Sequence, residues 1–552
     1  MKKLFFICLL IFPALICAQD QTVGLFSVSP DSYEGYTLFA PIRTTTTYLI
    51  DHCGNLVHEW ESDYTPGNSA YLLENGHLLK ASRVPELPVV NAGGYGGIIQ
   101  ILDWDSNVLW EYWYNSDSTM QHHDVAYMPN GNVLILAWET KTMEEAIQAG
   151  RNPSVVTPIG IYPVHIVEVE PVGQDSGTIV WKWHIWDHLV QEYDPTKDNY
   201  GIVADHPELL DINYHPGNSG ADWLHCNSIE YNPVLDQIVI SSRFNDEFYV
   251  IDHSTTTEEA AGHTGGNSGK GGDILYRWGN PEVYDRGDED DRMLFKQHDA
   301  SWIPEGLENG GKFMVFNNGF GQVGPDFSTV EVVDPPVDND GNYIIIGQEP
   351  FGPTESLTTF IAPNPSDFYT PYMGNAQVLP NGNILLCESS DGRFVEVDSQ
   401  GNTVWEYVNP ASGGGIVTQG NPIPSGPGQD NSVFRCYRYS PDFPGLTGKD
   451  LTPGLPIEIN PEDIDCPVTT SVMEPDEKYF IVYPNPAINW LIVEFPKEIS
   501  GQLKIFDAPG RKVFESQIQF SRKVEIDISP LDNGVYFLSV QGLSMQKVVI
   551  LR

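Results

Sequence analysis

A short phrase that recurs along the chain limits its fold more than any other feature. Each copy is a Gly or Asn turn followed by a short strand of alternating aromatic and apolar residues. The five copies start at Gly54, Ser106, Gly177, Gly272 and Gly401 and read GNLVHEW, SNVLWEY, GTIVWKW, GDILYRW and GNTVWEY. Recurrence of one small β unit predicts a β-propeller, in which blades surround a central channel. Side chains at equivalent places in successive blades then converge on one small volume.

A second repeat follows each aromatic phrase. It is an inner strand, a turn such as Asn-Gly, and a very apolar strand, which together are typical of a hairpin. The copies cover residues 68–79, 123–136, 227–240, 298–316 and 374–386. A sixth blade closes if the segment 36–48 joins the segment 433–439. We therefore expect an all-β chain with a six-bladed propeller.

The two ends of the chain differ from the propeller. Lys2 and Lys3 precede an apolar run from Leu4 to Cys17, which predicts a signal peptide over residues 1–18. No later stretch approaches the ~20 apolar residues of a membrane span. After a propeller over 19–466, residues 467–478 are typical of a linker, and the short strands of 479–552 predict a small β-sandwich.

Charge and cysteine content narrow the function classes. The net charge of −46 argues against nucleic acid and anionic membranes as partners, because both need a basic surface. Any site that binds an anion must therefore be a local concentration of positive charge in an acidic molecule. Removal of the signal peptide leaves five cysteines, so at least one has no partner within the chain. Their dispersed spacing favours isolated buried thiols, with a single bridge left open.

Four segments place polar groups at equivalent positions of the predicted inner hairpins. They are QHHD at 121–124, DWLHCNS at 222–228, SSRF at 241–244 and FKQHD at 295–299. Counting back from the turns places His123, Asn227 and His298 in one register. Because strand side chains alternate between faces, His225 shares the face of Asn227, and His123 is favoured over His122 as the channel residue.

Arg243 joins this cluster because it ends the strand that pairs with the one beginning at His225. Arg offers a permanent charge and a planar fork of donors, which suits a tetrahedral oxyanion. A neutral His nitrogen can attack sulfur or phosphorus while the other groups hold the oxyanion. The residues therefore predict anion binding and group transfer through a histidine.

The same segments resemble the bacterial arylsulfate sulfotransferase family. The resemblance rests on residues 222–229, 240–243, 277–279, 297–300 and 434–439, and it spans roughly 48–448. The family consists of six-bladed propellers that move a sulfuryl group from a phenolic sulfate ester to a phenol, without a nucleotide sulfate donor. The resemblance implies a phenolic sulfate donor and a phenol acceptor as partners, and neither a cofactor nor a metal.

The resemblance also implies roles for individual residues. His298 matches the histidine that becomes transiently sulfated. His225, Asn227 and Arg243 match the sulfate-binding and transition-state groups. His123 matches a further histidine that handles the phenolic proton, a role for which His122 stays open.

The tail resembles the C-terminal sorting domain of type IX secretion substrates of the Bacteroidota. It contains YPNP at 483–486, GRKV at 510–513 and NGVYFL at 533–538, in that order. The resemblance implies the type IX machinery as a partner and a secreted or cell-surface location.

Two other readings stay open at this point. One is a metalloenzyme that uses His123, His225 and His298 as ligands, although Arg243 beside them would repel a cation. The other is a surface-displayed propeller that binds a sulfated ligand without turnover. Nine further histidines show no such convergence, and we expect them on the surface or in loops: His52, His58, His77, His184, His188, His206, His215, His253 and His263.

Overall fold

The computed structural model describes residues 21–214, 220–462, 464–466, 480–483, 485, 487–507, 511–531, 533–540 and 546–550. The predicted signal peptide, the predicted linker and His215 lie outside these residues. The chain divides into two compact units, 1–467 and 468–552, which are described separately below.

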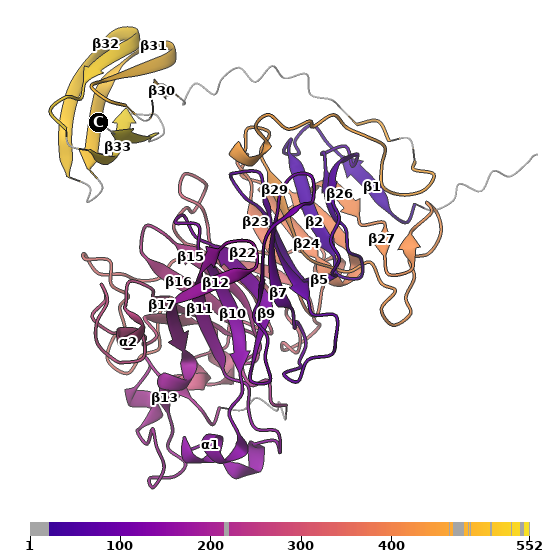
Figure 1. The fold of residues 1–552 in the computed structure, drawn as a ribbon, viewed down its shortest axis with the longest axis vertical. Coiled ribbons are helices and arrows are strands. Elements are labelled where there is room, and N and C mark those ends of the chain that lie inside the picture. Colours follow the sequence, from indigo (N-terminus) through magenta and orange to yellow (C-terminus); the bar gives the residue numbers. More distant parts are fainter. Residues whose placement is uncertain are drawn as a thin grey trace, which may run out of the picture. The chain divides into compact units, whose positions relative to one another are not determined.

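Six antiparallel sheets build the first unit, and each contributes four strands around the channel (Figure 1). From the inner strand outwards, blade 1 is β29 (Val433–Tyr439), β2 (Tyr36–Pro41), β3 (Thr47–Ile50) and β4 (Leu56–Trp60); blade 2 is β5 (Pro66–Leu72), β6 (Leu78–Arg83), β7 (Gly97–Leu102) and β8 (Val108–Trp113); blade 3 is β9 (Thr119–Tyr127), β10 (Val133–Glu139), β11 (Val164–Val172) and β12 (Ser176–His184).

The remaining blades follow in chain order. Blade 4 is β15 (Cys226–Asn232), β16 (Gln237–Ser242), β17 (Glu247–Asp252) and β18 (Tyr276–Trp278); blade 5 is β19 (His298–Trp302), β20 (Phe313–Asn317), β21 (Thr329–Val333) and β22 (Thr358–Phe360); blade 6 is β23 (Asn375–Val378), β24 (Ile384–Glu388), β25 (Arg393–Val397) and β26 (Thr403–Val408). The six-bladed architecture predicted from the repeats is confirmed.

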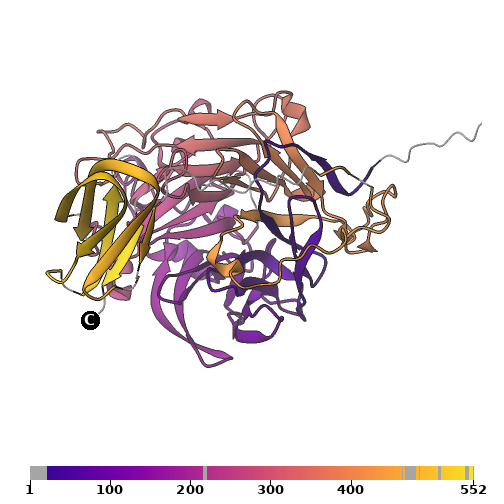
Figure 2. The ribbon, with the colours of Figure 1, turned by 90° about the horizontal axis from the view of Figure 1, so that it is seen from above.

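The ring is closed by strands from both ends of the unit. β2 pairs with β29, with Tyr36 opposite Tyr439, and β1 (Gly24–Val28) adds to the outer edge of blade 6 by pairing with β26. In Figures 1 and 2 the indigo N-terminal strands accordingly lie beside orange strands from the end of the propeller. Blade 1 therefore forms from the join that the sequence predicted.

The aromatic phrases become the outer strands of five blades and link each blade to its neighbour. The Trp60 indole N–H donates to the carbonyl of Asp103 in blade 2, at 3.1 Å. The Trp110 indole of blade 2 donates in turn to Ser176 of blade 3, at 2.8 Å. A buried Trp needs such a partner for its N–H, so each repeat supplies both packing and register between blades.

Short elements decorate the propeller. They are the helices α1 (Met143–Gln148) and α2 (Thr257–Ala260) and the two-residue strands β13 (Leu189–Val190), β14 (Leu210–Asp211), β27 (Ala411–Ser412) and β28 (Gly415–Ile416). Across the described ranges, no helix is long and apolar enough to span a membrane.

One disulfide joins Cys53 in the β3–β4 turn to Cys466. Cys226, Cys387 and Cys436 are free and buried. The bridge that the spacing left open is thus present, and it fastens the last described residue of the first unit to blade 1.

The second unit is a curled antiparallel sheet around its own apolar core. Its strands are β30 (Ile481–Tyr483), β31 (Trp490–Asp507), β32 (Lys512–Asp527), β33 (Gly534–Val540) and β34 (Gln546–Ile550). The long strands β31 and β32 pair with each other, and Leu491, Leu503 and Leu538 are fully buried in the core. The predicted small β domain is confirmed.

Candidate active site at one mouth of the channel

The inner strands begin at one mouth of the channel, where the structure brings three of the predicted histidines together. The rings of His123 and His225 lie edge to face, with centroids 4.7 Å apart. The Nδ1 atoms of His122 and His123 lie 3.0 Å apart. His122 is fully buried and stacks on Trp138, whereas His123 faces His225 and Phe434. His122 therefore lies behind His123 in the cluster.

His298, at the start of β19, is held at both ring nitrogens. Nδ1–H donates to Oδ1 of Asn318 at 2.7 Å, and the backbone N–H of Met373 donates to Nε2 at 3.1 Å. Burial lowers the pKa of His298 well below its ordinary value, and the charge of Arg243 lowers it further. The ring is therefore neutral, and its lone pair is on Nε2.

His225 immediately precedes β15 and is oriented by Asp222. Its Nδ1–H donates to Oδ2 of Asp222 at 2.5 Å, and its backbone N–H donates to the other carboxylate oxygen at 3.2 Å. This pairing fixes the tautomer and leaves Nε2 for a ligand.

Asn227 connects blades 4 and 5. Its side-chain amide donates to the carbonyl of Gln297 at 2.8 Å, directly before His298. Its Oδ1 is buried and accepts no hydrogen bond from any described residue. One amide hydrogen and the carbonyl oxygen of Asn227 thus stay available to a ligand.

Arg243 is the cationic group of the site. Its guanidinium lies 5.5 Å over the ring of Phe244, and none of the described residues offers an acceptor to its buried Nε. Within the described part of the chain, no carboxylate lies within ion-pairing distance of it. The nearby carboxylates are engaged elsewhere, Asp222 by His225 and Asp246 by Lys296 at 3.1 Å. In a chain of net charge −46, this unpaired Arg supplies the local positive charge that the sequence analysis requires of an anion site.

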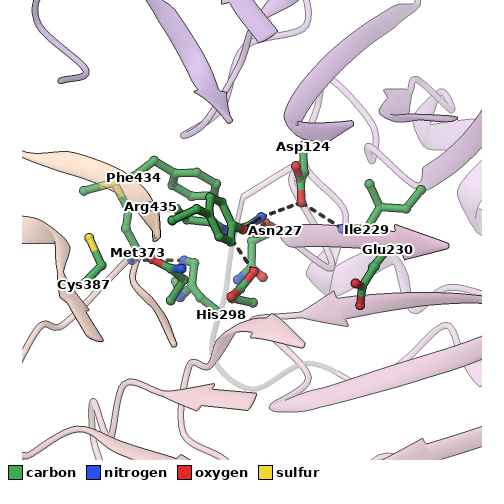
Figure 3. A network of polar contacts seen from close by, with 12 residues as sticks. Asp124, Asn227, Ile229, Glu230, His298, Met373, Cys387, Phe434 and Arg435 are labelled. Carbon is green, nitrogen blue, oxygen red and sulfur yellow. Dashed lines mark hydrogen bonds and ion pairs between the residues drawn. The ribbon is translucent and has the colours of Figure 1, made fainter. Parts of the chain in front are cut away.

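A buried ion-pair network lies next to His298 (Figure 3). The Arg435 guanidinium, from the innermost strand β29, pairs with Asp124 at 2.8 Å and with Asp299 at 3.1 Å. It also donates to the backbone carbonyl of Asn227 at 3.0 Å. Asp124 and Asp299 directly follow His123 and His298, so one side chain ties together the three strands that carry the site.

The backbone at the mouth adopts an uncommon conformation. His123, His225 and Met373 have φ values of 54°, 49° and 61°, in the left-handed region. Such residues each cost about 1–3 kcal/mol and persist only where the surrounding structure enforces them. Simple strand alternation therefore does not hold at His123 or His225, although both rings still reach the site.

Sequence reasoning missed three contributors. Asn318 and Met373 orient His298 but belong to the end of blade 5 and the loop before blade 6, and neither carries a motif. Arg435 belongs to the segment 434–439 that carries part of the family resemblance, but the resemblance predicts no role for it. The one signal for Asn318 is its place two residues after Phe316, where the equivalent position in blade 4 is Arg243.

One of the remaining histidines contradicts the expectation of a surface or loop position. His188 is fully buried, and its two ring nitrogens lie 2.8 Å from Oδ1 of Asp273 and 2.8 Å from the carbonyl of Ala260. His263 contacts the same carboxylate at 2.7 Å. His188 lies in the long segment between β12 of blade 3 and β15 of blade 4. This segment contains no repeat, so no sequence pattern predicts that His188 is buried.

The geometry gives no support to the metal alternative. In the described residues, two groups of three side chains bring potential ligand atoms within 4.8 Å of one another. One is His188, His263 and Asp273, and the other is His52 with the disulfide-bonded Cys53 and Cys466. Neither includes His123, His225 or His298.

Comparisons with known proteins identify the tail and the propeller separately. The family described as secretion system C-terminal sorting domain matches residues 481–551, which identifies the tail as an export signal for the cell surface or the exterior. No curated protein matches the chain. Solved structures with distant similarity include a protein of unknown function from Bacteroides caccae (11% identity over 74% of this chain and 99% of that one, TM-score 0.38) and the periplasmic gluconolactonase PpgL of Pseudomonas aeruginosa (9%, 94% and 100%, TM-score 0.34).

The family described as arylsulfotransferase (ASST) matches residues 27–410. That range covers blades 2 to 6 in full and contains all six predicted site residues. Because it spans more than half of the chain, the protein belongs to the arylsulfotransferase family.

Proposed function

We propose that the protein transfers a sulfuryl group from a phenolic sulfate ester to a phenol, with His298 as the group that carries it between the two. The observation that carries this proposal is the juxtaposition of an unpaired Arg243 with a neutral His298 whose tautomer is fixed by Asn318. One group attracts the sulfate, and the other presents a nucleophilic lone pair.

The donor binds with its sulfate against Arg243. Asn227 adds a hydrogen bond to a sulfuryl oxygen, because its second amide hydrogen is uncommitted. His225 adds another in its imidazolium form, in which Nε2–H donates to the sulfuryl group while Nδ1–H stays on Asp222. Preorganised donors of this kind stabilise charge as it develops in the transition state.

In the first transfer, Nε2 of His298 attacks sulfur. The N–S bond forms, the S–O bond to the phenol breaks, and the phenolate leaves with the electron pair. In the second transfer the oxygen of an acceptor phenol attacks the same sulfur, and the N–S bond breaks. His123 accepts the proton of the acceptor and returns it to the next leaving phenolate, so that charge and atoms balance over the cycle.

Met373 acts in this scheme as a donor that changes acceptors. Its N–H donates to the lone pair of Nε2 in the absence of substrate. Once sulfur occupies that position, the same N–H donates to a sulfuryl oxygen. Asn318 holds the Met373 carbonyl through its own amide at 2.7 Å, so one residue positions both the ring and its partner.

The test is steady-state turnover of a chromogenic aryl sulfate by the purified protein, with and without added phenol. We expect phenol to stimulate release, and His298→Ala to abolish it, with a loss of at least about 10³-fold. His77→Ala, in the partly exposed β5–β6 turn, is the matched control and should retain activity. Full activity in His298→Ala would contradict the proposal. Binding of aryl sulfates without turnover in the wild type would support the non-catalytic alternative.

A further inference from the structure

In blades 2 to 6 the second strand runs antiparallel to an inner strand that begins at the active-site mouth, so the residue at or next to its last position lies at that mouth. We aligned the second strands of blades 2 to 6 by their pairing with the inner strands. Each blade then has one residue at this position. The residues are Arg83, Trp138, Arg243, Asn318 and Ser389.

Contacts show that this position belongs to the site in the other blades. Trp138 stacks on His122 with ring centroids 4.0 Å apart, and Asn318 binds Nδ1 of His298. The Ser389 hydroxyl donates to the carbonyl of Phe434 at 2.9 Å. Arg83 occupies the same position in blade 2, which adjoins the blade that carries His123.

The surroundings of Arg83 lead to the same mouth. Its guanidinium lies 5.3 Å from the ring centroid of Tyr95, whose backbone forms a β-bridge with His122. The preceding Gly94 packs so closely on His123 that a Cβ there would lie 2.2 Å from the imidazole Cε1. Arg83 therefore lies near the His122–His123 pair, to which it is connected through the segment that contains Gly94 and Tyr95.

Arg83 also has no counterion among the residues that the structure describes. Its Nε is buried without an acceptor, and over the described ranges no carboxylate lies within ion-pairing distance of its guanidinium. The charged neighbour that does act on it is another cation, Arg43, which is itself paired with Asp430 at 3.0 Å. Two unpaired guanidiniums, Arg83 and Arg243, thus occupy equivalent positions on either side of the His123 blade.

We propose that Arg83 binds a second anionic group of the substrate. The substrate class is an aromatic sulfate ester that carries a further carboxylate or sulfate on its ring system, with Arg243 holding the transferred sulfate and Tyr95 flanking the ring. Arginine recognises carboxylate and sulfate alike through its fork of donors. The identity of the first anion rests on the proposed function, whereas the second site rests on Arg83 itself.

Equilibrium binding of two unreactive sulfonates tests this assignment by calorimetry. Benzenesulfonate carries one anionic group, and 4-sulfobenzoate adds a carboxylate. We expect the wild type to bind 4-sulfobenzoate about tenfold more tightly. Arg83→Met should remove that preference and leave the affinity for benzenesulfonate unchanged, and Arg83→Lys should retain part of it. Arg43→Met is the matched control for a nearby charge and should retain the preference in full.

Two results would overturn the inference: equal affinity of the wild type for both ligands, or an equal loss for both ligands in Arg83→Met with an unchanged unfolding temperature. Turnover measured in parallel distinguishes a failure of this inference from a failure of the proposed function. A wild type that prefers 4-sulfobenzoate through Arg83 but transfers no sulfuryl group would refute the proposed chemistry and not the second anion site.

Discussion

The two halves of the central channel are built by the same inner strands but carry opposite chemistry. At the mouth where the strands begin, His123, His225 and His298 gather beside Arg243. Further along the strands, a cavity of about 360 Å³ is lined by Glu230 and Asp299 together with tyrosines and Trp302. Arg435 lies between the two and pairs with Asp124 and Asp299 (Figure 3).

The difference teaches how a fold with internal repeats builds an asymmetric site. At the histidine mouth, burial lowers the pKa of His298 and the unpaired Arg243 lowers it further, because a second positive charge would be repelled. Buried carboxyl groups are tolerated further along the inner strands, because the positive charge of Arg435 balances the negative charges of Asp124 and Asp299. Burial still raises the pKa of Asp299 to about 6 and that of Glu230 to about 8. Each half therefore sets the charge state of its own titratable groups.

The largest expected effect comes from removing the cation between the two halves. Arg435→Met leaves Asp124 and Asp299 buried without their partner, and breaking a buried pair in this way costs about 3–5 kcal/mol. We expect a correspondingly lower free energy of unfolding in urea, together with loss of activity. Adding Asp299→Asn to this variant should restore part of the stability. If Arg435→Met is as stable as the wild type, the two halves do not depend on this link.

A second change acts on the histidine mouth alone. Asn318→Ala removes the acceptor that orients His298, so kcat should fall by about 10²-fold or more while KM changes little. Asn317→Ala is the matched control, because Asn317 is also buried but accepts the backbone N–H of Phe295 at 2.8 Å and does not bind His298. An equal loss of kcat in both variants would reduce the role of Asn318 to general stability.

The smallest effect concerns the acidic half. Glu230 accepts the backbone N–H of Trp302 at 2.6 Å and has a raised pKa, so its protonated form favours the folded state. That contribution is complete below about pH 4.5 and is lost as the pH rises through about 8. Glu230→Gln keeps the acceptor but does not ionise. Its unfolding temperature, relative to the wild type, should therefore rise between pH 5 and pH 8, and a constant difference would contradict this assignment.

The sequence predicted the ring because its signals are local and repeated. The Trp phrases and the hairpin turns each occur five times, and the five units together with a sixth blade closed from the two ends specify the propeller. The register of His123, Asn227 and His298 followed from counting back from those turns. Closure by β2 and β29 was also predictable, because two unmatched strands remained at the ends.

The parts that escaped prediction depend on contacts between blades. Asn318 and Met373 meet His298 from a neighbouring strand and loop, and Arg435 reaches the site from blade 1 across the channel. Left-handed backbone at His123 and His225 has no sequence signal, because histidine rarely adopts it without tertiary enforcement. The buried His188 lies in an excursion where no repeat provides a register.

The central claim is that His298 carries the sulfuryl group, and trapping that species tests it most directly. The purified protein is mixed with an aryl sulfate without acceptor, quenched at alkaline pH, digested and mapped by mass spectrometry. The account predicts a sulfuryl group on the peptide that contains His298, and its disappearance when phenol is added before the quench. Phenol-dependent turnover with no sulfuryl group on that peptide, or with the group on His225 instead, would contradict it.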